Sequence, residues 1–222
     1  MKKPVIDYRT FRLRKLTTPQ FSHLWLLLDW VGFFLLFFLT EKFIPADRCF
    51  TVHIPLDDFI PFCEWFLIPY ALWFGLIVFS LGYFLLYNIR SFKRLQTYII
   101  ITQIVAMAIY IIFPTRQDLR PEVFPRDNFL TQCVAFLYAI DTPTGVCPSL
   151  HVAYSFGIAS VWLREKGISP VFKTFIVLLV ALICLSTVFI KQHSALDFFA
   201  ALPLCLLAEI LVFGRNYRRI KA

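Results

Sequence analysis

Long apolar blocks separated by short polar turns constrain this chain of 222 residues more than any other feature. A helix that crosses a bilayer needs about 20 mostly apolar residues. Hydrophobic residues make up 59% of the sequence, which exceeds the share usual for a soluble domain. The pattern predicts an all-α, polytopic membrane protein. Its six transmembrane helices are expected at residues 24–43, 64–87, 97–113, 148–163, 171–190 and 194–213.

The remaining segments predict one compact domain without repeats or linkers. A shorter apolar stretch at 129–140 is too short to span a bilayer and is expected to form an extra helix at the outer surface. Residues 1–222 are then a single membrane-embedded domain, and residues 1–20 form a basic cytoplasmic segment. The first apolar block is too long for a cleavable signal peptide, and no small-residue cleavage site follows it.

The net charge of +8 is distributed unevenly between the two sides of the predicted bundle. Sixteen of the 22 Lys and Arg residues fall in 2–15, 90–94, 164–173 and 215–221, which six spans place on one side. Because basic residues favour the cytoplasmic side, we expect both termini in the cytoplasm and a multi-pass location in the cell membrane. The charge therefore indicates topology, and no nucleic-acid partner is expected.

Two of the four histidines fall at the outer starts of different spans, which brings them to a similar depth. His193 and Asp197 are four residues apart and would share one face of a helix. The carboxylate would fix the proton on one ring nitrogen and leave the other free as a nucleophile or base. His151 is the second histidine. The alternative is an interfacial histidine beside a capping acid.

Two further features of the outer side are suited to phosphate. Ser149 is a good N-terminal cap, and a helix that begins there would offer free N–H groups to an anion beside His151. Arg116 and Arg120 follow the third span, and guanidinium groups match phosphate oxygens. An ordinary helix cap and two solvated or headgroup-contacting arginines are the alternatives.

These segments together resemble the signature motifs of the type 2 phosphatidic acid phosphatase and vanadium haloperoxidase superfamily. That family has Lys-x6-Arg-Pro, then Pro-Ser-Gly-His, then Ser-Arg-x5-His-x3-Asp. The matching segments here are Arg120-Pro121, Pro148-Ser149-Leu150-His151 and Ser186 through Asp197.

Three departures accompany this resemblance. Phe113, Leu150 and Thr187 stand where the family has Lys, Gly and Arg. The Leu and Thr are similar to the inositol phosphorylceramide synthase branch, whose members move phosphorylated headgroups between lipids. Two expected cations are missing, and the candidates to replace them are Arg116, Arg126 and Lys191.

The resemblance implies a lipid phosphatase or phosphotransferase that acts on a phospholipid or isoprenyl phosphate at the outer face. His193 would form a phosphohistidine, Asp197 would orient it, and His151 would act as general acid. No metal or cofactor is implied. The phosphate-binding residues would be Arg120, Ser149, Ser186 and Arg116.

Other interpretations remain open at this stage. Headgroup transfer, as in inositol phosphorylceramide or sphingomyelin synthases, competes with hydrolysis. A transporter with a His and Asp proton relay, or an inactive scaffold, would belong to other classes. Cys133 and Cys147 are candidates for a disulfide. The acids Asp57, Asp58 and Glu64 are expected to cap helices rather than contact a headgroup, and the intramembrane Asp29 is a candidate functional residue.

Overall fold

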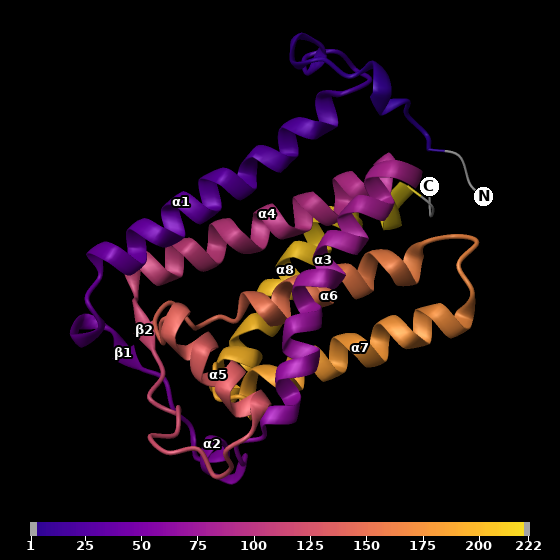
Figure 1. Ribbon diagram of the computed structural model, residues 1–222. Coiled ribbons are helices and arrows are strands. Elements are labelled where there is room, and N and C mark those ends of the chain that lie inside the picture. The colour runs from indigo at the N-terminus through magenta and orange to yellow at the C-terminus, as the bar shows by residue number, and fades with distance from the viewer. Residues whose placement is uncertain (1–3, 220–222) are drawn as a thin grey trace.

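The computed structural model describes residues 4–219, with side chains described for residues 4–214. Lys2, Lys3 and Lys221, used in the charge argument, lie outside the described residues. The chain is almost entirely helical (Figure 1). Its α-helices are α1 (Leu28–Phe43), α2 (Pro55–Phe59), α3 (Leu67–Tyr87), α4 (Ile89–Ile112), α5 (Phe129–Ile140), α6 (Leu150–Arg164), α7 (Pro170–Phe189) and α8 (Ala195–Arg219).

Short elements connect these helices. Strands β1 (Phe50–Thr51) and β2 (Thr115–Arg116) pair in parallel. The 3-10 helices are η1 (Tyr8–Thr10), η2 (Leu13–Lys15), η3 (Ser22–Leu27), η4 (Ala46–Arg48) and η5 (Glu64–Phe66).

Five helical segments among the described residues are long and apolar enough to cross a membrane. This confirms an α-helical chain and is consistent with a membrane protein. The remaining predicted span corresponds to α6, which has 15 residues and is shorter than a typical span. The six-span count therefore stays a prediction. The five segments are Ser22–Phe43, Glu64–Tyr87, Ile89–Ile112, Pro170–Phe189 and Ala195–Gly214.

The third span begins earlier than the sequence predicted. Helix α4 starts at Ile89, and Asn88 caps it by accepting a hydrogen bond from the backbone N–H of Ser91 at 3.2 Å. A single residue thus separates α3 from α4. The basic residues expected in a turn lie instead in the first turns of α4. Phe92 and Leu95 lie among them and are buried, so this part of α4 packs on the bundle. These basic residues are Arg90, Lys93 and Arg94.

Helix α6 lies at the centre of the bundle, packed against α4, α7 and α8. Gly157 lets α4 approach closely, because a Cβ there would come within 2.5 Å of the ring of Tyr98. Trp162 is buried and stacks on Phe79. Helix α6 is short, but its central position lets it contact the three neighbouring helices α4, α7 and α8.

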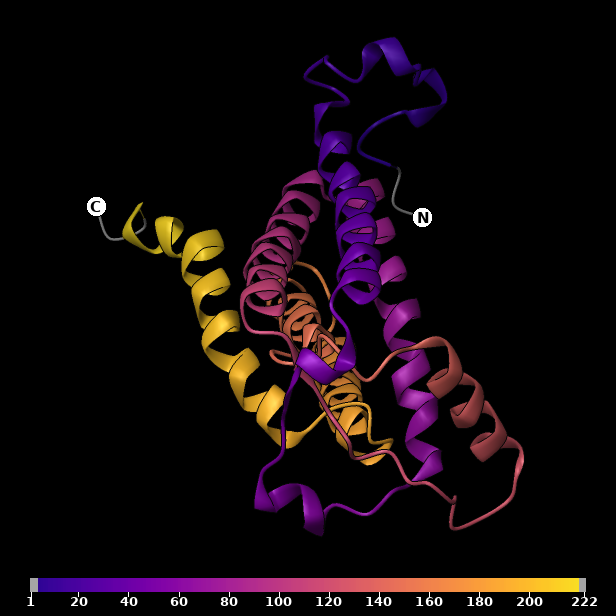
Figure 2. The same cartoon turned by 90° about the vertical axis from the view of Figure 1, so that its left-hand side faces the viewer.

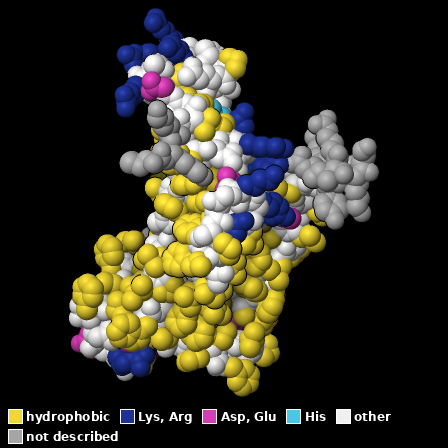
Figure 3. All heavy atoms as spheres, turned by 90° about the vertical axis from the view of Figure 1, so that its right-hand side faces the viewer, with side chains coloured by type: hydrophobic (Ala, Val, Ile, Leu, Met, Phe, Trp, Pro, Cys, Tyr) yellow, Lys and Arg dark blue, Asp and Glu magenta, His cyan; other side chains and the backbone are white. Residues whose placement is uncertain are grey.

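Helix α1 is peripheral by comparison. It packs on α4, along which it runs in Figure 1, and has no buried residue of its own. Hydrophobic side chains cover much of the face seen in Figure 3, whereas Lys and Arg gather toward one end. The first described residues and the last turns of α8 lie toward that same end, where α3 meets α4 (Figure 2). The end of the bundle where α6 and α8 begin is called the site end below.

At the site end, the segment between α1 and α3 packs on the segment between α4 and α6. Helix α5 has the bounds predicted for the extra helix, and Asn128 caps it. Arg126 forms a forked ion pair with Glu64, with Nε–Oε1 and Nη2–Oε2 distances of 2.8 Å. Asn128 donates to the same carboxylate at 3.0 Å. All six cysteines are unpaired, so the expected Cys133–Cys147 disulfide is absent from the described structure.

Candidate active site

The starts of α6 and α8 meet through backbone contacts at the site end. The N–H of Ser149 donates to the carbonyl of Asp197 at 3.1 Å. The turn between α7 and α8 closes when the N–H groups of Gln192 and His193 both donate to the carbonyl of Thr187 at 3.0 Å. These bonds fix His193 beside the first turn of α6. The two histidines expected at one depth are therefore brought together.

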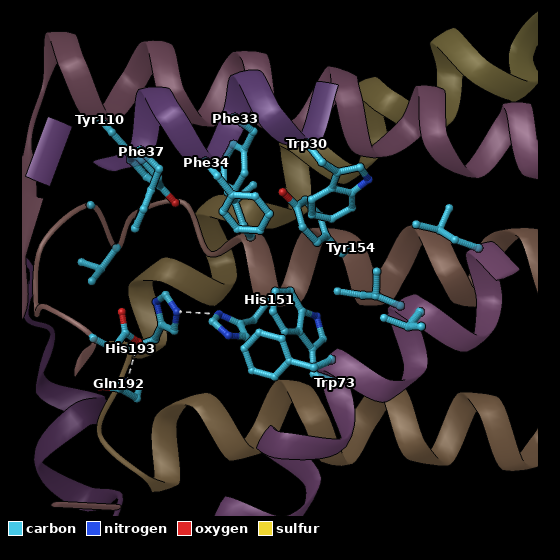
Figure 4. Close-up of a pocket in the computed structure, with 18 of the residues that line it drawn as sticks. Trp30, Phe33, Phe34, Phe37, Trp73, Tyr110, His151, Tyr154, Gln192 and His193 are labelled. Atoms are coloured by element: carbon cyan, nitrogen blue, oxygen red, sulfur yellow. Dashed lines mark hydrogen bonds between the residues drawn. The ribbon is translucent and has the colours of Figure 1, made fainter. Parts of the chain in front are cut away.

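His193 is held at both ring nitrogens, and Figure 4 shows its contact with His151. Its Nδ1 lies 3.0 Å from Oδ2 of Asp197, which is fully buried. Its Nε2 lies 3.2 Å from Nδ1 of His151 and 3.4 Å from Oγ of Ser149. Because a carboxylate only accepts, Nδ1 of His193 carries the proton and Nε2 presents its lone pair. This lone pair is the candidate nucleophilic position in the cluster.

The pairing of His193 with Asp197 arises differently from the prediction. Helix α8 begins at Ala195, so His193 precedes the helix rather than sharing one of its faces. Asp197 lies in the first helical turn, and its Oδ2 also accepts from the N–H of Ser194 at 3.1 Å. The carboxylate therefore acts as a cap that reaches back to the imidazole. The spacing of four residues remains the right one for this geometry.

His151 lies in the first turn of α6 between aromatic rings from α3. Its ring centroid is 4.1 Å from that of Trp73 and 4.7 Å from that of Tyr70. Nε2 of His151 is buried and has no hydrogen-bond partner among the described residues. Ser149 caps this helix as predicted, accepting from the N–H of Val152 at 3.4 Å. The aromatic contacts fix the ring plane of His151 relative to His193.

Arg120 reaches the site through Gln192, the residue before the candidate nucleophile. Its Nη2 donates to Oε1 of Gln192 at 2.6 Å and to the carbonyl of Asp141 at 2.7 Å. The guanidinium also lies 4.5 Å from the ring of Tyr138. Burial lowers the pKa of Arg120, and it raises the pKa of the Asp141 carboxyl, to which Gln192 Nε2 donates at 2.8 Å. Arg120 is therefore linked to His193 only through Gln192, the residue that precedes it in the chain.

Two predicted phosphate-binding residues lie in other environments. The hydroxyl of Ser186 donates to the carbonyl of Ile183 at 2.6 Å inside α7. Arg116 contacts Thr51 at 3.3 Å and forms an ion pair with Asp118 at 3.2 Å, which ties β2 to β1. Neither side chain is brought to His193 in the described structure.

The other candidate cations also have partners elsewhere. Lys191 donates to the carbonyls of Asp57 at 3.0 Å and Ile60 at 2.5 Å, and burial lowers its pKa. Arg126 is paired with Glu64. Among the replacements considered for the missing Lys and Arg, neither these two nor Arg116 joins Arg120 at the site.

Asp57 is a helix cap for the site, as the sequence favoured. Its Oδ1 accepts from the N–H of Ala195 at 2.7 Å, and its Oδ2 accepts from the hydroxyl of Ser194 at 2.6 Å. Asp57 is buried, so α2 is fixed against the start of α8. Asp58 instead contacts the exposed His53 at 2.8 Å.

Four residues around the histidines were not predicted from the sequence. Gln192 could have been predicted, because it directly precedes His193 in the chain. Tyr70, Trp73 and Asp141 come from distant segments, and their proximity depends on tertiary packing. Within the part of the chain that the structure describes, no three His, Cys, Asp or Glu side chains are grouped to hold a metal ion.

A cavity of about 580 Å³ opens from this cluster between α1, α3 and α6 (Figure 4). His151, His193 and Gln192 line one end of it, and aromatic and aliphatic side chains line most of the rest. Comparisons of the chain with protein-family models, with curated proteins and with solved structures find no match.

Proposed function

We propose that the protein is an integral membrane enzyme that transfers a phosphoryl group from a lipid phosphate through a phosphohistidine on His193. The observation that carries the proposal is the contact of the His193 imidazole with the carboxylate of Asp197. Asp197 holds its Nδ1 at 3.0 Å, and its Nε2 lies beside His151 and Ser149 at the end of an apolar cavity. The motif resemblance to the type 2 phosphatidic acid phosphatase superfamily supports the same assignment.

The first step forms a bond between Nε2 of His193 and phosphorus while the bond to the lipid oxygen breaks. His151 donates a proton to that leaving oxygen, which departs as an alcohol. Asp197 stabilises the positive imidazole that develops, because its carboxylate accepts the Nδ1 proton. In the second step His151 takes a proton from water, whose oxygen attacks phosphorus and releases inorganic phosphate and free His193.

The phosphoryl oxygens are stabilised by Arg120, Ser149 and the N–H groups at the start of α6. Arg120 is hydrogen-bonded to Gln192, the neighbour of His193, and a helix start is favourable for an anion. Phosphoryl transfer depends mainly on positioning and charge stabilisation, so a single arginine with ordered amides is chemically sufficient. Ser186 and Arg116 have no role here, since their polar atoms are bonded elsewhere. The basic bias of the sequence supports an extracytoplasmic site.

Headgroup transfer is the second candidate function. The donor would then be a phosphodiester, whose lipid alcohol leaves in the first step while the phosphorylated headgroup stays on His193. An alcohol on a second lipid would replace water in the second step, with the same proton transfer to His151. Leu150 and Thr187 favour it, because they are similar to the inositol phosphorylceramide synthase branch. The apolar lining of the cavity also favours a lipid acceptor over water.

The test is phosphate release by purified full-length protein from a panel of phospholipids and isoprenyl phosphates, with and without a ceramide or diacylglycerol acceptor. Wild-type protein is expected to release phosphate or to form a new phospholipid. His193→Ala is expected to abolish both and to remove acid-labile labelling by phosphate. His53→Ala is the matched control, since His53 is exposed and pairs with Asp58. Full activity of His193→Ala would refute the nucleophile, and inactivity of wild type on every substrate would favour a transporter or scaffold.

A further inference from the structure

The cavity beside His193 extends far from the polar cluster. On α3 its lining residues recur on one face of the helix from Trp73 to Leu85. Twelve residues of helix cover about 18 Å at 1.5 Å per residue. On α1 the lining runs in the opposite chain direction, from Phe37 near the site to Trp30, and Leu27 at the end of η3 continues it to the far end. Both walls thus run from the histidines toward the end where α3 meets α4.

The cavity is open along its side. Helix α1 packs mainly on α4 and η3, so it leaves the gap toward α3 unfilled by its own backbone. Phe34, Phe74 and Val78 line the cavity and are 60%, 57% and 73% exposed, respectively. In a chain that spans a membrane these exposed edges face lipid. The cavity is therefore a groove reached from within the bilayer.

The size of the groove is suited to a slender ligand. Its volume of about 580 Å³ falls within the ~300–1,000 Å³ typical of small-molecule sites. Polar lining residues are concentrated near the histidines, and the far end is lined by Leu81, Gly82 and Leu85. A ligand that fills it has a polar group at one end and a long apolar body at the other.

We propose that the groove between α1 and α3 holds one long hydrocarbon chain of the lipid phosphate and sets the chain length that the enzyme accepts. This inference rests on the proposed function, because the phosphate of the same lipid lies at His193. The chain passes Trp73 and ends near Gly82. The lipid reaches the site sideways from the bilayer, between α1 and α3.

Selection by this groove is steric. Chains in a bilayer are already in an apolar surrounding, so moving one into the groove brings no hydrophobic gain from water. Fit against the aromatic walls then decides which chains are accepted. A side chain that fills the far end excludes long chains and leaves room for short ones.

Two glycines of α3 form a matched pair for the test. A Cβ at Gly82 or at Gly75 would meet no heavy atom within 4 Å, so both positions admit a side chain. Gly82 lines the groove, whereas Gly75 is exposed and is not among its lining residues. Gly82→Phe and Gly75→Phe therefore make the same change to helix propensity, and they differ in whether the groove is filled.

The experiment measures turnover of a series of single-chain lipid phosphates of increasing length by full-length protein in nanodiscs. Gly82→Phe is expected to lower the ratio of long-chain to short-chain turnover by roughly tenfold or more, as substitutions in a fitted apolar pocket do. Gly75→Phe is expected to keep the wild-type ratio. Equal loss at all lengths, or an equal change in both variants, would overturn the proposal. Gly82→Leu repeats the test with a smaller side chain.

A binding measurement separates this inference from the proposed chemistry. A lipid phosphate with a photoreactive group at the end of its chain is irradiated with His193→Ala protein, which cannot turn it over. Labelling is expected on α3 near Leu81 and Leu85, and it should fall in the Gly82→Phe variant. Labelling without turnover by wild type would retain the groove and reject the function. Turnover without labelling there would reject the groove.

Discussion

The polar groups around His193 and those between α1, α4 and α6 are both buried, but the first set is the more extensively hydrogen-bonded, although Nε2 of His151 and Oδ1 of Asp197 have no partner among the described residues. Asp57, Asp197 and Gln192 each contact two or more groups at the site end. Between α1, α4 and α6, both polar atoms of the Gln103 side chain and the hydroxyl of Ser155 have no partner among the described residues. Burial alone thus does not distinguish a functional cluster.

The comparison shows what a catalytic group requires. A buried polar side chain that is bonded to several partners is held in one geometry, whereas a side chain whose polar atoms all lack partners costs free energy and is not oriented by hydrogen bonds. The network around His193 joins α2, the α5–α6 connection and α8. The imidazole orientation therefore depends on residues far apart in the chain, and substitutions can test each connection.

The largest expected effect follows from removing the Asp197 carboxylate, which contacts His193 at the site end. Asp197→Asn is expected to lower turnover by roughly 10²–10⁴-fold, because His193 loses the charge that fixes its Nδ1 proton and stabilises the imidazolium. Turnover of a lipid phosphate under saturating substrate measures it. Asp58→Asn is the control, since Asp58 pairs with an exposed histidine. Similar turnover in both variants would contradict the role of Asp197.

An intermediate effect is expected at the contact between α2 and α8. Asp57→Ala leaves the hydroxyl of Ser194 and the N–H of Ala195 without their acceptor. The free energy of unfolding is expected to fall by about 1–3 kcal/mol, the usual cost of an unsatisfied buried group. Thermal unfolding in detergent measures this loss, and turnover is expected to fall with it. An unchanged midpoint would show that α8 is capped without α2.

The smallest effect is expected in the second polar region. Gln103→Leu is expected to leave stability unchanged or slightly increased, because the amide that it removes is buried without partners in the described chain. Gln192→Leu makes the same change at the site end and is expected to lower turnover, since it removes the link to Arg120. Thermal unfolding and turnover of both variants provide the comparison. A large destabilisation by Gln103→Leu would mean that this region is also bonded.

The sequence predicted the elements better than the contacts between them. Apolar block length located α3, α5 and α7 to within three residues, because such blocks must be buried in protein or lipid. It placed the start of α4 eight residues late, since the basic residues after Asn88 were assigned to a turn. A capping Asn permits these residues to be helical, and hydropathy does not detect a cap.

The candidate site shows the same division. The spacing of His193 and Asp197 identified a pair that is in contact, although Asp197 acts from the first turn of α8 rather than along a helix face. The positions of Lys191, Arg116 and Arg126 required tertiary contacts, as did those of Tyr70 and Trp73. Spacing within a segment is therefore informative, whereas the choice of cation at a shared site depends on packing.

The attachment of α2 to the turn before α8 has a consequence for inhibition. Asp57 holds the start of α8, and Lys191 in return donates to two carbonyls of the α2 segment, so the two segments are linked in both directions. Leu56 and Phe59 of α2 are exposed. An antibody fragment or cyclic peptide that binds α2 and displaces it is expected to shift His193 without occupying the proposed lipid groove. Such an inhibitor would lower the maximal rate and leave the apparent affinity for lipid unchanged.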